Sequence, residues 1–121
     1  MSNVISTGSR RIVTGDIAPH KPPKPKKRKP WFIVRTLSAG VFAGEIQSRK
    51  GQEVVMRNAR RLWYWRGAAS LSQMATIGTS KPMECKFPCA VDRVRLLQAI
   101  EILDVTDTAR ASIEGVPVWQ E

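Results

Sequence analysis

Hydrophobic and polar positions divide the chain into two parts that meet near Trp31. Before it, residues 1–30 hold only scattered hydrophobic side chains, too few to build a core. From Trp31 onward, short runs rich in aromatic and β-branched residues alternate with turn residues, which is typical of β-strands joined by tight connections. The pattern predicts an extended N-terminal arm over residues 1–30, followed by a single compact β-rich domain over residues 31–121.

The apolar runs of the second part predict strands over residues 31–36, 41–47, 53–57, 91–96 and 99–105. Gly51 supplies the positive φ for a hairpin turn between the second and third of these strands. The run over residues 60–66 is either a strand of its own or the continuation of the third strand after a bulge. Because hairpins dominate, the sheet should be antiparallel.

Two short helices complete the predicted fold. Ser70 is a candidate N-cap with Gln73 three residues later, which forms a capping box. A second helix begins at Thr106 or Asp107 and ends at Gly115. The fold class is therefore mainly β with two short helices (α+β), built as a small curved antiparallel sheet or a partly open barrel.

Charge is concentrated in the arm. The net charge is +10, and residues 1–30 hold eight Lys/Arg against the single acid Asp16, whereas residues 31–121 hold twelve against nine acids. Residues 21–30 alternate proline and lysine, which favours an extended polyproline II chain. This arm binds phosphates or an acidic protein surface, is a solubilising tail, or carries a nuclear-import pattern in residues 26–29. The candidate partner-binding residues are Lys21, Lys24, Lys26, Lys27, Arg28 and Lys29.

Arginine and aromatic residues interleave over residues 60–66. In an extended chain, Arg61, Trp63 and Trp65 share one face. Such a face either packs in the core or at a protein interface, where Trp and Arg are common anchors, or stacks a base. On the strand over residues 91–96, two arginines share a face that either extends a cationic surface or is solvated and paired with Glu45, Glu101 or Asp104. The candidate interface or ligand-binding residues are Arg60, Arg61, Trp63, Trp65, Arg93 and Arg95.

The residues offer no recognisable catalytic site. The predicted domain has no histidine, no phosphate-binding glycine loop and no nucleophile–base set. Cys85 and Cys89, with His20 far away in the arm, do not make a usual zinc site. In an extended chain the two Cα atoms lie about 13 Å apart, too far for a disulfide, so both are expected to be buried reduced thiols. We expect no enzyme, cofactor or metal. No signal peptide or membrane span is evident, so a cytosolic origin is the default.

Several segments resemble a known family, above all residues 58–73 (NARRLWYWRGAASLSQ), with shorter stretches at 34–36, 38–41, 44–46, 99–102 and 115–119. On these segments the chain is similar to small proteins of unknown function in tailed-phage and prophage genomes. The arm lies outside the resemblance.

The resemblance implies three kinds of function. The first expectation is a virion-associated protein, such as a capsid cement or decoration subunit. Its partners would be other phage capsid or tail proteins and further copies of itself, with no membrane. The second is a phage inhibitor or sponge in the host cytoplasm that binds an anionic nucleotide of host defence. The third is an accessory protein that binds nucleic acid through the arm.

Overall fold

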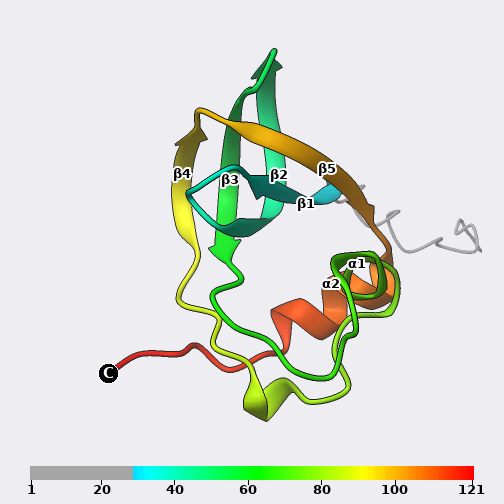
Figure 1. Ribbon diagram of the computed structural model, residues 1–121. Coiled ribbons are helices and arrows are strands. Elements are labelled where there is room, and N and C mark those ends of the chain that lie inside the picture. Colours follow the sequence, from blue (N-terminus) through cyan, green and yellow to red (C-terminus); the bar gives the residue numbers. More distant parts are fainter. Residues whose placement is uncertain (1–28) are drawn as a thin grey trace, which may run out of the picture.

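The structure is a computed structural model that describes residues 29–121 (Figure 1). A five-stranded antiparallel sheet has the strand order β4-β3-β2-β1-β5. The predicted arm, apart from its last two residues, lies outside the described residues. The elements are β1 (Trp31–Thr36), β2 (Val41–Lys50), β3 (Glu53–Arg61), α1 (Leu71–Ile77), the 3₁₀ turn η2 (Pro82–Glu84), β4 (Val91–Leu96), β5 (Ala99–Val105) and α2 (Asp107–Glu114).

The sheet is curled but does not close. Strands β4 and β5 follow each other in the chain, yet they occupy opposite edges of the sheet. The chain passes from one edge to the other over one end of the curl (Figure 1), where Ala99 N–H donates to the Gln52 carbonyl at 3.0 Å. The predicted mainly β, curved antiparallel sheet with two short helices is confirmed, and it is open.

Both faces of the sheet carry buried hydrophobic side chains, which form two separate clusters. Side chains alternate along β1, so Trp31 and Ile33 pack with the helices and the C-terminal segment, whereas Val34 points to the concave face. The helix-side core contains Trp31, Ile33, Ala43, Leu62, Met74, Ala75, Cys85, Phe87, Ile113 and Val116. The concave-side core contains Val34, Phe42, Val54, Met56, Ala59, Leu96 and Ala99.

The predicted strands β1, β4 and β5 have the predicted bounds, while β2 and β3 run further than expected. Residues 60–61 continue β3 after a bulge, as one of the two alternatives proposed. Residues 62–66 leave the sheet and keep only an isolated bridge from Tyr64 to Lys86. The reason is that β2 begins at Val41, whose carbonyl accepts from Leu62 N–H at 2.8 Å, so no partner strand remains beyond that point.

Both predicted helix starts are confirmed. The Ser70 hydroxyl accepts from Gln73 N–H at 3.2 Å, and the Gln73 side chain accepts from Ala69 N–H at 3.0 Å, which closes a capping box one residue wider than usual. At α2, the Thr106 hydroxyl accepts from Ala109 N–H at 3.0 Å. These caps fix the helices against the helix-side core.

The cysteine prediction is half right. Cys85 is buried, but Cys89 is exposed, and both are free thiols. Alternation fails after Phe87 because Pro88 has no N–H and the chain there belongs to no strand, so Cys89 is carried to the surface.

Candidate partner-binding face

Arg60 is inside the molecule, which removes it from the predicted surface. Only 7% of its area is exposed. Its guanidinium donates to the carbonyls of Pro88 (2.9 Å), Ile113 (2.9 Å) and Phe87 (3.0 Å). Burial lowers the pKa of Arg60, and the nearby Cys89 acts in the opposite direction. Arg60 therefore holds β3, the segment before β4 and the end of α2 together.

Arg61, Trp63 and Trp65 line one cleft of about 290 Å³. These three residues are called the Arg–Trp face below. Trp63 is 62% exposed, Arg61 is exposed and Trp65 is half-buried. The Arg61 guanidinium carbon lies 4.6 Å from the centre of the Phe42 ring, which orients the side chain. The predicted grouping of these three side chains on one surface agrees with this geometry.

The turn between β1 and β2 lines the same cleft and is held in one conformation. The backbone N–H and the hydroxyl of Thr36 both donate to the Gly40 carbonyl, at 3.0 and 2.7 Å. The Thr36 hydroxyl also accepts from Ala39 N–H at 2.8 Å. Gly40 has φ +98°, a conformation that only glycine adopts without strain. The Arg–Trp face therefore lies beside a turn that its own hydrogen bonds hold in one conformation.

Arg93 and Arg95 lie on β4, on the face opposite its buried Leu96, as predicted. Arg95 lines a second cleft of about 250 Å³ that shares residues 38–39 with the first. The β1–β2 turn therefore stands between Arg95 and the Arg–Trp face. Arg93 lies two residues before Arg95 on β4 and pairs with Arg57 on β3.

The acids suggested as partners for these two arginines are placed elsewhere. Glu101 pairs with Arg35 at 2.9 Å across β5 and β1. Glu45 and Asp104 form no ion pair with either arginine within residues 29–121. In the described part of the chain, the arginine face of β4 is cationic and unneutralised.

A second aromatic cluster adjoins the C-terminus and was not anticipated. The Lys86 ammonium lies 5.7 Å from the centre of the Tyr64 ring and 5.6 Å from that of Trp119. A side-chain hydrogen bond with Tyr64 raises the pKa of Arg66, and the charges of Tyr64 and Glu84 add to the rise. Sequence reasoning missed the cluster because Lys86 and Trp119 lie far from Tyr64 along the chain.

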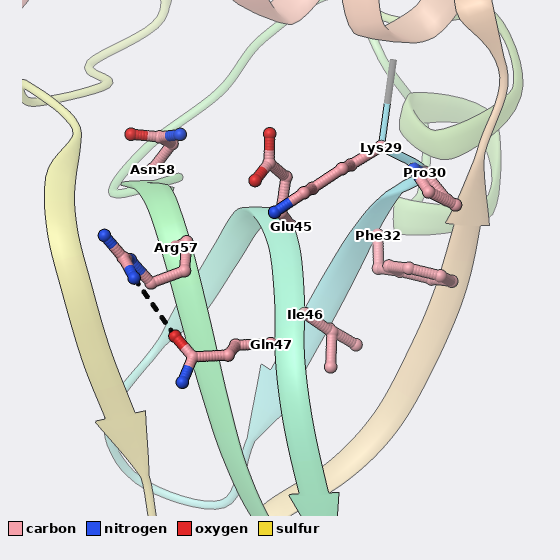
Figure 2. A pocket seen from close by; sticks show the side chains of 8 residues that line it. All are labelled: Lys29, Pro30, Phe32, Glu45, Ile46, Gln47, Arg57 and Asn58. Atoms are coloured by element: carbon pink, nitrogen blue, oxygen red, sulfur yellow. Dashed lines mark hydrogen bonds between the residues drawn. The ribbon is translucent and has the colours of Figure 1, made fainter. Parts of the chain in front are cut away.

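A larger cavity, of about 710 Å³, opens on the concave face of the sheet (Figure 2). Of its residues only Lys29 was among the sequence-based candidates, and Lys21, Lys24, Lys26, Lys27 and Arg28 lie outside the described residues. The cavity, called the concave pocket below, is lined by Lys29, Pro30, Phe32, Glu45, Ile46, Gln47, Arg57 and Asn58.

The described residues contain no candidate metal site and no candidate membrane-spanning helix. No three His, Cys, Asp or Glu side chains within residues 29–121 group as metal ligands would. In the same range, no helix has the length and hydropathy needed to cross a membrane.

The fold and the face define a small curled β-sheet protein with an arginine–tryptophan surface. The chain belongs to the family described as a domain of unknown function (DUF6948), whose model matches residues 29–113. The match begins at the last arm residues and ends within α2. No curated protein and no solved structure matches the chain.

Proposed function

We propose that this chain is a non-enzymatic phage protein that assembles into the virion, as a capsid cement or decoration subunit does. It docks on a capsid or tail protein, or on another copy of itself, through the Arg–Trp face. The basic arm supplies a second contact with an acidic surface. The observation that carries the proposal is the exposure of Trp63 beside Arg61, at the edge of a fixed turn.

The energetics of Trp63 support a docking role. A tryptophan side chain offers roughly 200 Å² of mostly apolar area, of which 62% is accessible here. Covering it would contribute about 3 kcal/mol at 25 cal/mol per Å². Trp and Arg are also the residues most enriched among interface anchors. A partner that covers Trp63 would therefore gain binding free energy from this side chain.

The test compares how variants enter phage particles. Trp63→Ala should lower incorporation by roughly 30- to 150-fold if equilibrium binding sets it, since about 2–3 kcal/mol is lost. Met83→Ala removes another exposed apolar side chain, 80% accessible, and should incorporate normally. A chain lacking residues 1–28 should also incorporate poorly. Normal entry of the Trp63→Ala variant would refute docking through this face.

A second candidate function is binding of an anionic nucleotide at the same face. The specific observation in its favour is that Arg61, Trp63 and Trp65 line one cleft, so a cation for phosphate and rings for stacking a base are adjacent. Thermal-shift screening with cyclic and linear nucleotides tests it. A stabilisation that Trp63→Ala abolishes would favour this function, and no shift at millimolar ligand would count against it.

A further inference from the structure

The concave pocket is built by two irregularities in the pairing of β2 and β3. Ala43 pairs with Arg60 and Glu45 with Arg57, so two residues of β3 stand opposite the single residue Gly44. Further along, Ile46 pairs with Met56 and Ser48 with Val55, which leaves Gln47 as an extra residue on β2. Such bulges re-aim side chains and are frequent beside binding sites.

Both bulges bring a carboxamide to the pocket. Asn58 has φ +50°, a left-handed conformation uncommon for a residue with a side chain, and it lines the pocket. Gly44 permits this arrangement, because a Cβ there would lie 2.9 Å from the Asn58 carbonyl oxygen. Gln47 lines the pocket from the opposite strand. The left-handed backbone of Asn58 and its close approach to Gly44 therefore place the Asn58 side chain at the pocket that Gln47 also lines.

The remaining lining residues supply an apolar floor and a charge. Phe32 and Ile46 are half-buried and pack against the concave-side core. Glu45 is also half-buried, and no hydrogen bond or ion pair holds its carboxylate within residues 29–121. Figure 2 shows Lys29 extending toward Glu45 across the pocket, with Phe32 and Ile46 on the β1 side.

On the opposite wall of the pocket, the charge of Arg57 is already paired and its side chain is held by hydrogen bonds. Arg57 donates to the Asp92 carboxylate at 3.2 Å, to the Asp92 carbonyl at 2.9 Å and to the Gln47 side-chain oxygen at 3.2 Å. The Gln47 amide nitrogen is therefore left to donate elsewhere (Figure 2). The groups that remain for a ligand are the Glu45 carboxylate, the two carboxamides, the Lys29 ammonium and the Phe32 ring.

We propose that the concave pocket binds a guanine base. A carboxylate has two acceptor oxygens side by side, and guanine presents two adjacent N–H donors on one edge, whereas neutral adenine and cytosine present a single donor next to an acceptor. The Asn58 amide donates to the guanine carbonyl oxygen, and the base lies on Phe32 and Ile46. This site is separate from the Arg–Trp face, and the inference does not rest on the proposed virion role.

The experiment is a titration of the full-length ¹⁵N-labelled protein with GMP, AMP and ribose 5-phosphate at one ionic strength, followed by amide chemical shifts. GMP should shift the amides of residues 31–32, 45–47 and 57–58 saturably. AMP should bind about tenfold more weakly or worse. Ribose 5-phosphate reports the phosphate contribution alone and should leave residues 45–47 unshifted.

Variants separate the pocket from other effects. Glu45→Gln should weaken GMP binding about tenfold or more, because it removes one of the two acceptors and the charge. Asn58→Gly keeps the left-handed backbone while removing the carboxamide, and should weaken GMP binding several-fold. Glu53→Gln, at an exposed acid by the β2–β3 turn, should leave it unchanged.

Several results would overturn the guanine site. They are a pocket that shows no GMP shift at millimolar nucleotide, AMP binding as tight as GMP binding, and an effect of ribose 5-phosphate equal to that of GMP. Unchanged GMP affinity of the Glu45→Gln variant would also overturn the guanine site. If GMP shifts instead residues 61–65 and Trp63→Ala abolishes the effect, the nucleotide site is the Arg–Trp face and the concave pocket is not one.

Discussion

Replacing Arg60 with methionine should destabilise the fold by about 2–4 kcal/mol. The guanidinium donates to three carbonyls, and the Pro88 carbonyl is the one among them for which no second donor is found in the described chain. The Phe87 carbonyl also accepts from Trp119 N–H, and the Ile113 carbonyl from Val116 N–H. The two buried carbonyls that keep another donor cost about 1–2 kcal/mol each, which sets the range, and the part-buried Pro88 carbonyl brings the loss toward its upper end.

Methionine refills the volume without repairing the hydrogen bonds. A buried ion pair can often be replaced by apolar side chains with no loss, because both charges leave together. Arg60 differs, since its partners are backbone carbonyls that stay buried after the substitution. The Arg60 guanidinium also lies 5.6 Å from the centre of the Phe87 ring, a contact that methionine replaces in part.

Urea denaturation followed by tryptophan fluorescence measures the effect. With a slope of about 1–2 kcal/mol per molar urea, the midpoint of the Arg60→Met variant should fall by roughly 1–4 M. Arg61→Met is the matched control, because that side chain is exposed and its ring contact contributes less than about 1 kcal/mol. Equal midpoints for the two variants, or a loss below about 1 kcal/mol at position 60, would refute the reasoning.

Three further results are expected. Gly44→Ala should lower the free energy of unfolding by more than about 2 kcal/mol in urea melts, because its Cβ would lie 2.9 Å from Asn58 backbone, and wild-type stability would contradict the close approach. Ser70→Ala should cost about 1 kcal/mol through loss of the α1 N-cap, measured the same way, whereas no change would show that the cap is dispensable. In the native protein Cys89 should react with a thiol reagent at once and Cys85 only on unfolding, and equal rates would contradict their placement.

The sequence predicted well those elements that depend only on residues close together in the chain. The aromatic and β-branched run of β1, the hairpin at Gly51 with φ +59° and the Ser70 cap depend on neighbouring residues, and all three are present. The end of β3 could not be predicted in this way. It depends on where β2 begins, since residues 62–66 lie beyond the last available partner.

Part of the candidate site could be predicted from the sequence, because it depends only on which side chains share one face of an extended chain. Alternation places Arg61, Trp63 and Trp65 together, and they line one cleft. The same alternation puts Arg60 on the other face, but only the three-dimensional contacts show that this face is covered by Phe87 and α2. The concave pocket was missed because it depends on two bulges, and a shift of one residue in register changes which side chains share a face.

The most direct test of the proposed function, a phage virion protein, is mass spectrometry of phage particles purified from induced or infected cultures that carry the gene, with the copy number of this protein measured against the major capsid protein. We predict a high copy number in a fixed, symmetry-related ratio, which a cement or decoration subunit requires. Absence of the chain from particles, while it is present in the infected cell, would contradict the virion role and leave nucleotide binding as the leading function.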